Sequence, residues 1–352
     1  MKKAIIYGVT GQDGSYLSDL LLSKEYTVYG ITRRSSVNNT SRITHSLNKN
    51  NFNLVQGDVT DTSSIYRLLN EVQPDEVYNL AAQSHVGTSF EQPQLTWNVT
   101  GQGCLNILEV IRSMANRPRF YQASSSEMFG DQFSTGPNLS LNENHYPKQE
   151  PYQDENTPFS PQSPYAIAKC AAHHSVRLYR ESYGLHACGG ILFNHESERR
   201  GSEFVTRKIS RYVANLHWAT KRGRSIPKLK LGNLTSRRDW GHARDYVEAM
   251  WMMLQYDEPV DFVIATGKAH SVEDYLKEAF KCINIVEYMD YVEIDKALKR
   301  PSEVPYLRGI AGEAKRRLKW TPKIKFNELV SKMVQNDLQN TNGCEEDNRS
   351  PA

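Results

Sequence analysis

The stretch Gly8-Val9-Thr10-Gly11-Gln12-Asp13-Gly14 stands between a short apolar run at residues 4–7 and a leucine-rich segment at residues 14–23. The apolar run has the length of a buried parallel strand, and the leucines recur at helical spacing. A pyrophosphate binds where backbone N–H groups are free at a helix N-terminus and no Cβ stands in the way. Glycines three residues apart meet both needs. Glycine turns also arise for steric reasons alone, but the flanking strand and helix favour a dinucleotide-binding unit.

The segments that follow alternate between strand-like and helix-like patterns. Short apolar runs predict strands, and apolar residues at helical spacing predict the helices between them. The strands are expected at residues 27–31, 54–55, 76–80 and 119–123, and the helices at residues 61–69 and 99–114. This alternation predicts an α/β fold, a Rossmann-type doubly wound parallel sheet with a smaller α/β C-terminal substrate-binding region.

The expected division of the chain into domains follows from this alternation of strands and helices. Residues 1–185 mainly form the nucleotide-binding domain, and a strand at 187–194 returns to it. Residues 195–339 mainly form the substrate-binding region, with further returns to the sheet allowed, and residues 340–352 form a polar, flexible tail. The spacing Ser271-Val272-Glu273-Asp274 predicts a helix with a capping box. Residues 131–159 have no apolar period and predict a long surface loop.

Composition excludes several classes of protein. The 352 residues include 39% hydrophobic residues and carry a formal net charge of +3, so the chain is neither disordered nor strongly attracted to nucleic acid. No apolar run approaches the roughly 20 residues that cross a bilayer, so no membrane partner is expected. The five cysteines form no Cys-x-x-Cys pair. This pattern favours reduced thiols in the cytoplasm and predicts no metal site.

The end of the second expected strand indicates which dinucleotide binds. An Asp or Glu about 20 residues after the glycine turn would contact a free ribose 2′-hydroxyl. The chain has Arg33-Arg34-Ser35-Ser36 instead, which suits a 2′-phosphate and favours NADP. A solvated basic loop or a subunit contact is the alternative. The next strand is followed by Asp58-Val59, where adenine would lie. The strand after it is followed by Leu80-Ala81-Ala82-Gln83-Ser84, beside the cofactor crevice.

Four residues predict the chemistry. Tyr165 and Lys169 lie one helical turn apart, so that a nearby ammonium favours the phenolate form of a general base. Ser125 and Glu127 follow the fifth strand, whose carboxyl end opens into the ligand crevice. A serine hydroxyl there can hold a sugar oxygen. Simple alcohol oxidation needs no carboxylate, so Glu127 indicates proton removal beside a new ketone; a turn-capping glutamate is the alternative.

At these residues the chain resembles the extended short-chain dehydrogenases/reductases, and among them the GDP-mannose 4,6-dehydratase family. The resemblance extends from residue 3 to about residue 338. Its specific stretches are residues 10–17, 33–36, 78–80, 82–86, 194–197, 204–210 and 237–242.

The resemblance implies a role for each matching residue. The catalytic residues would be Ser125, Glu127, Tyr165 and Lys169. NADP would contact Gly8, Thr10, Gly11, Gln12, Asp13, Gly14, Arg33, Arg34, Ser35, Ser36, Asp58, Val59, Leu80, Ala81, Ala82, Gln83, Ser84, Lys169, His195 and Arg200. The GDP-sugar would contact Ser84, Ser125, Glu127, Tyr165, Asn194, Lys208, Arg238, Arg300 and Glu303.

The chain departs from the family pattern at a few positions. Ser125 stands where the family usually has threonine, which keeps the hydroxyl. Leu95 replaces a tyrosine that usually contacts the cofactor, and Glu198 replaces a usual proline. Residues 131–152 form a longer insertion than usual, which puts closure of a lid in doubt.

The implied activity is NADP-dependent dehydration of GDP-mannose to GDP-4-keto-6-deoxymannose by internal hydride transfer from C4 to C6. This reaction feeds the synthesis of 6-deoxyhexose nucleotides such as those of fucose and rhamnose. The resemblance also implies a homodimer or homotetramer. Three alternatives remain open: NADPH-dependent reduction of the 4-keto product as a second activity, a nucleotide-sugar epimerase, and a non-catalytic NADP sensor.

Overall fold

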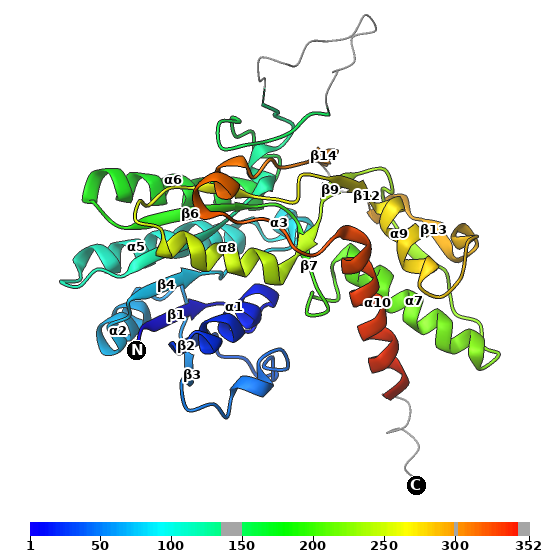
Figure 1. Ribbon diagram of the computed structural model, residues 1–352, viewed down its shortest axis with the longest axis horizontal. Helices are drawn as coiled ribbons and strands as arrows, with labels where there is room; N and C mark the ends of the chain where they lie inside the picture. The colour runs from blue at the N-terminus through cyan, green and yellow to red at the C-terminus, as the bar shows by residue number, and fades with distance from the viewer. Residues whose placement is uncertain (135–149, 299–301, 344–352) are drawn as a thin grey trace, which may run out of the picture.

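The structure, a computed structural model, describes residues 1–134, 150–298 and 302–343 (Figure 1). Its centre is a seven-stranded parallel sheet with the order β11-β6-β5-β4-β1-β2-β3. The strands are β1 (Lys3–Tyr7), β2 (Thr27–Thr32), β3 (Phe52–Gln56), β4 (Glu76–Asn79), β5 (Arg119–Ser125), β6 (Ala187–Leu192) and β11 (Phe262–Ile264). Strand order reverses between β1 and β4, which creates a crevice at their carboxyl ends. The predicted doubly wound fold is confirmed.

Two helical layers cover the sheet because the strand residues alternate between its faces. In β1, Ile5 and Tyr7 join one core with the helices α2, α5 and α6, whereas Ala4 and Ile6 join the other core with α1 and α8. The bounds of these helices are α1 (Gln12–Ser23), α2 (Thr62–Val72), α5 (Gly103–Ser113), α6 (Pro164–Tyr183) and α8 (Ala243–Gln255). Both faces of the strands are therefore buried, as their continuous apolar runs require.

The helix expected at residues 99–114 differs from the prediction. Residues 99–102 belong to a π-helical turn, Trp97–Gln102, and α5 follows it; two short helices, α3 (Val86–Glu91) and α4 (Pro93–Thr96), come before the turn. The hydroxyl of Thr100 in this turn accepts the backbone N–H of Gln83, 3.2 Å away. The widened turn thus contacts the loop that leaves β4, next to the crevice.

Most of the remaining elements form the right-hand part of Figure 1. Helices α7 (Val205–Lys221), α9 (Val272–Lys281) and α10 (Phe326–Gly343) share a separate apolar core. The short strands are β7 (His195–Glu196), β8 (Leu229–Leu231), β9 (Arg237–Asp239), β10 (Gly241–His242), β12 (Ala269–Ser271), β13 (Val292–Ile294) and β14 (Tyr306–Leu307). The predicted capping box of Ser271 and Asp274 is present at the start of α9.

The sequence analysis did not foresee α7, α8 or β11. Helix α8 and strand β11 complete the main sheet and its covering layer, although both come from the second half of the chain. Helix α10 continues to Gly343, into the segment expected to be a tail. Residues 344–352 lie outside the described residues.

The long loop predicted at residues 131–159 contains no helix or strand in the parts that are described, 131–134 and 150–159. Its base is anchored on the C-terminal segment, where the buried Gln153 exchanges backbone hydrogen bonds with Arg308 and Ile310. The predicted insertion largely lies outside the described residues, since residues 135–149 are not among them.

Among the described residues, no helix is long and apolar enough to cross a membrane. The same part of the chain contains no group of three or more His, Cys, Asp or Glu residues arranged to hold a metal ion.

Candidate active site

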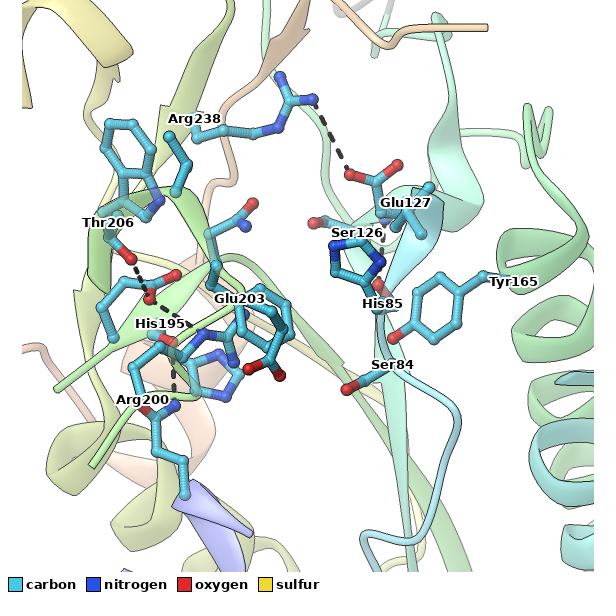
Figure 2. A pocket seen from close by; sticks show the side chains of 18 of the residues that line it. Ser84, His85, Ser126, Glu127, Tyr165, His195, Arg200, Glu203, Thr206 and Arg238 are labelled. Carbon is cyan, nitrogen blue, oxygen red and sulfur yellow. Dashed lines mark hydrogen bonds and ion pairs between the residues drawn. The ribbon is translucent and has the colours of Figure 1, made fainter. Parts of the chain in front are cut away.

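A cavity of about 470 Å³ opens at the carboxyl ends of β1, β4, β5 and β6. One wall comes from the main sheet, and the other from α7 and the strands β8 and β9 (Figure 2). Predicted site residues that line it come from both walls. They are Gly8, Gly11, Gln12, Asp13, Gly14, Leu80, Ala82, Ser84, Ser125, Glu127, Tyr165, Lys169, Asn194, His195, Arg200, Lys208, Arg238 and Glu303.

The glycine turn forms one end of the cavity. Gly8 has a φ of +84°, and a Cβ on Gly14 would lie 2.3 Å from the carbonyl oxygen of Gly8. Both positions therefore need glycine. Helix α1 starts after Gly11 with no side-chain cap, so its first N–H groups remain available for an anion. The backbone fits the pyrophosphate that the sequence predicted.

The predicted 2′-phosphate loop lies beside this turn. Arg33, Arg34, Ser35 and Ser36 follow β2 on an exposed loop outside the cavity lining. Arg42, further along the same loop, donates from Nη1 to the carbonyl oxygen of Thr10 at 3.2 Å. The loop is thus tied to the glycine turn and stays open to a ligand.

The predicted cofactor residues after β3 and β4 form hydrogen bonds with neighbouring parts of the chain. Asp58 accepts hydrogen bonds from the backbone and hydroxyl of Thr60, and the buried Val59 accepts one from the Asn106 amide. Gln83 donates to the hydroxyl of Thr96 at 3.2 Å. Asp58, Val59, Ala81 and Gln83 all stand outside the lining of the cavity, to which this part of the chain contributes Leu80, Ala82 and Ser84.

The catalytic residues predicted from sequence meet at the end of β5. The Ser163 hydroxyl caps α6, which places Tyr165 and Lys169 one turn apart on the cavity side. The Tyr165 hydroxyl hydrogen-bonds to Ser125. Lys169 Nζ donates to the carbonyl oxygen of Ala123 at 2.6 Å. One hydroxyl, one phenol and one amine therefore face the same space.

The structure shows how burial affects the pKa of Tyr165 in the protein without a cofactor. Burial raises the pKa of Tyr165 to about 12, although the hydrogen bond from Ser125 acts in the opposite direction. Burial also lowers the pKa of Lys169 to about 8. The sequence argument considered the Lys169 charge and left out the desolvation of the phenol, which dominates in the protein alone.

Glu127 lies on the single helical turn Ser126–Phe129 that follows β5. Its backbone N–H donates to Ser125 Oγ at 3.3 Å, which fixes the turn against the strand end. Arg238 reaches across the cavity towards it, with 3.9 Å between Nη2 and Oε1 (Figure 2). The carboxylate therefore faces the space that Tyr165 also lines.

The opposite wall holds the predicted substrate residues. Asn194 follows β6, and its carbonyl oxygen accepts the Gly241 N–H. Lys208 lies exposed on α7, and Glu303 accepts a hydrogen bond from the Asn233 amide at 2.9 Å. Arg300 lies outside the described residues.

His195 and Arg200 lie on the segment after β6. His195 contacts Asp13, with 2.8 Å between Nε2 and Oδ2. Burial opposes the charged imidazole, but the Asp13 carboxylate raises the pKa of His195 above its usual value. Arg200 pairs with Glu196 at 3.0 Å and stacks over Phe204.

Several lining residues were not singled out as ligand contacts from the sequence. They include Glu203 and Phe204 before α7, and Lys230 and Asn233 around β8. Their segments are distant in sequence from the glycine turn, so no local spacing signals them.

Comparison with known proteins identifies the family. The family model described as GDP-mannose 4,6 dehydratase matches residues 5–333. This chain belongs to the GDP-mannose 4,6-dehydratase family. An Arabidopsis thaliana protein named GDP-mannose 4,6 dehydratase 1 is 48% identical over 348 residues, covering 96% of this chain and 90% of the relative. A human GDP-mannose 4,6 dehydratase is 45% identical over 361 residues, covering 96% and 91%. The resemblance drawn from the sequence is confirmed.

Solved structures share the fold of this family member. A dTDP-glucose 4,6-dehydratase from Streptomyces venezuelae, with NAD bound, has a TM-score of 0.81 at 19% identity, covering 97% of this chain and 98% of that one. A Pseudomonas aeruginosa protein solved with NADPH has a TM-score of 0.71 at 19% identity, covering 97% and 100%. These likenesses confirm the Rossmann-type α/β fold.

Proposed function

We propose that this protein converts GDP-mannose to GDP-4-keto-6-deoxymannose, with NADP as the cofactor and without net consumption of it. The observation that carries the proposal is the position of Glu127. Its carboxylate lines the same cavity as Ser125, Tyr165 and Lys169, so an acid–base group for elimination accompanies a complete dehydrogenase set. Membership in the GDP-mannose 4,6-dehydratase family supports the same reaction.

The residues divide the work of the reaction. The Ser125 hydroxyl holds the hexose 4-oxygen, and Tyr165, as phenolate, takes the 4-hydroxyl proton. The bound nicotinamide would supply hydride exchange, accepting from C4 and later donating to C6. The 4-ketone acidifies the hydrogen at C5, so Glu127 can remove that proton and assist loss of water from C6. Tyr165 returns a proton to C5, which completes the balance.

The basic loop after β2 supports NADP as the cofactor. Arg33 and Arg34 are exposed beside the glycine turn, where a ribose 2′-phosphate would extend. Guanidinium groups form charge-assisted, often bidentate hydrogen bonds to phosphate, whereas a free ribose hydroxyl would need an acceptor that this loop does not begin with. Loss of both arginines should therefore weaken NADP more than NAD.

The GDP end of the substrate would lie along the opposite wall. Lys208 and Arg238 supply positive charge for a diphosphate, and the Glu303 carboxylate can accept hydrogen bonds from ribose hydroxyls. The homodimer or homotetramer suggested by the family resemblance stays a prediction. Glu127 disfavours an epimerase, which needs no elimination group, and the presence of Tyr165 and Lys169 disfavours a sensor.

Incubation of the purified protein with GDP-mannose and catalytic NADP tests the proposal. We expect a product lighter by one water, with no accumulation of NADPH. Deuterium placed on C4 of the hexose should appear on C6. Product without that transfer, or no product from any sugar nucleotide, would contradict the proposal, and Tyr165→Phe provides the inactive control.

A second incubation with excess NADPH addresses the reductase alternative. Net consumption of NADPH together with a 6-deoxyhexose nucleotide would add that activity to the dehydration. Unchanged NADPH after complete dehydration would exclude it.

A further inference from the structure

We propose that the side chains of Gln12 and Asp13 act mainly as positioning residues, which fasten the pyrophosphate-binding turn to the segment that carries Asn194, His195 and Arg200. The inference rests on the proposed cofactor site. It assigns the backbone of this turn to the cofactor and its two polar side chains to the segment after β6.

Both polar atoms of the Gln12 amide form hydrogen bonds to the segment after β6. Its Oε1 accepts the hydroxyl of Ser197 at 2.7 Å, and its Nε2 donates to the carbonyl oxygen of His195 at 3.1 Å. The same Nε2 lies 3.1 Å from Asp13 Oδ1. Gln12 is 8% exposed and Ser197 is fully buried, so these bonds are sheltered from water. An interior amide with such partners is held in one orientation.

The second carboxylate oxygen of Asp13, Oδ2, contacts the same segment. His195 Nε2 lies 2.8 Å from Asp13 Oδ2, and His195 Nδ1 lies 2.7 Å from the carbonyl oxygen of Phe193. Both partners are hydrogen-bond acceptors, so both ring nitrogens carry protons and the ring is an imidazolium. The Tyr246 ring stacks on it with centroids 4.5 Å apart. The imidazolium is thus fixed by an ion pair, a carbonyl and a stacked ring.

These contacts join two segments of the cavity lining that are far apart in the sequence. The glycine turn begins the cofactor site, and the segment 194–200 leads from the end of β6 towards the proposed substrate wall. Breaking the link leaves each segment folded but free to move relative to the other. Cofactor affinity then falls because the cradle must be ordered on binding.

A double-mutant cycle on NADPH binding tests the link without any sugar. We expect Asp13→Asn and His195→Gln each to weaken NADPH binding about tenfold, with the double variant within about threefold of the weaker single variant. This non-additivity is the signature of two side chains that act through each other. Losses that multiply in the double variant, or no loss in either single variant, would overturn the proposal.

A pH series separates positioning from a general loss of structure. His195 faces the Asp13 carboxylate on α1, Arg200 on its own segment and the Tyr246 ring on α8. The ion pair exists below the raised pKa of His195 and is lost above it, so NADPH affinity should fall as pH rises through that pKa. In Asp13→Asn no ion pair can form at any pH, so this fall should disappear. An unmoved profile would contradict the inference.

Two further variants provide a weaker perturbation of the same link and a control away from the cavity. Ser197→Ala removes only the hydroxyl that Gln12 accepts and should give a smaller loss of affinity in the same direction. Glu71→Gln, which removes a carboxylate paired with Arg67 on the exposed face of α2, should leave NADPH binding unchanged. Because NADPH binding is the readout, the cycle is informative even if the protein fails to dehydrate GDP-mannose.

Discussion

Tyr165 is subject to opposing effects on its ionisation. Burial raises the pKa of its hydroxyl to about 12, whereas the Ser125 hydrogen bond favours the phenolate. The neighbouring Lys169 donates to the Ala123 carbonyl, and burial lowers the pKa of this lysine to about 8. The protein alone therefore holds the phenol protonated near neutral pH. The positive charge of an oxidised nicotinamide is the additional influence that would lower the pKa of Tyr165 during the reaction.

Replacing Ser125 should move this balance. In Ser125→Ala the phenolate loses its hydrogen bond, so the pKa of Tyr165 rises and the increase of kcat with pH shifts to higher pH. At neutral pH we expect a loss of about 10²-fold in kcat, typical of one removed proton-transfer contact. The measurement is a pH–rate profile with GDP-mannose. Ser124→Ala serves as the control, because Ser124 hydrogen-bonds to His173 and its loss should leave the profile in place.

Replacing Glu127 should block the elimination of water and leave the first hydride transfer intact. Glu127→Gln keeps the shape of the side chain but removes the base for C5, so reduced cofactor should accumulate while water is retained by the sugar. Absorbance of the reduced nicotinamide and the mass of the sugar nucleotide measure the two outcomes together. Product formation at the wild-type rate would remove Glu127 from its assigned role.

At the scale of elements, the start of helix α9 gives a direct test of local sequence signals. The Ser271 hydroxyl accepts the Asp274 N–H at 3.0 Å, and the Asp274 carboxylate accepts the Ser271 N–H at 2.8 Å. Ser271→Ala should lower the free energy of unfolding by about 1 kcal/mol, because it leaves an N–H of the first turn without its partner. Urea unfolding measures the change. Ser23→Ala, at the exposed end of α1, should change it by less than about 0.5 kcal/mol.

Signals that can be predicted from sequence are those whose partners lie a few residues apart. The glycine turn and the Ser271 cap belong to this kind, and so does the Tyr165–Lys169 spacing. Helix α8 and strand β11 were missed because their role is to cover and extend a sheet built by the first half of the chain. The same reason hid the contacts of Gln12 with Ser197 and of Glu127 with Arg238. The effect of burial on the pKa of Tyr165 was also missed, because burial is a property of the whole fold.

At the scale of the molecule, the two halves of the chain complete each other. The core on one side of the sheet joins α1 from the first half to α8 from the second, and β11 adds the edge strand next to β6. The cavity takes its walls from both halves as well. A fragment of residues 1–185 would lack β6, β11 and α8, so we infer that the chain folds as one cooperative unit.

The ion pair between Arg180 and Asp261 connects these halves. Arg180 on α6 donates to both carboxylate oxygens of Asp261, at 3.0 and 2.8 Å, and Asp261 also accepts the Gly189 N–H of β6 at 2.6 Å. Each side chain is only 16% exposed. Helix α6, strand β6 and the segment that leads into β11 are therefore joined by one half-buried ion pair.

Removing that charge should destabilise the whole molecule in a pH-dependent way. Burial works against the ionised form, but Arg180 lowers the pKa of Asp261 below its usual value in the folded protein. The carboxylate therefore contributes stability above the unfolded pKa of about 3.9, and this contribution is lost as pH falls through the lower, folded pKa. At neutral pH, Asp261→Asn should lower the free energy of unfolding by about 3 kcal/mol, because the half-buried Arg180 loses the carboxylate that balances its charge. Chemical unfolding at a series of pH values should show this difference shrinking in acid. A deficit that stays constant down to the acid transition would assign the loss to packing, since the titration of Asp261 is what should make the difference between the two proteins depend on pH.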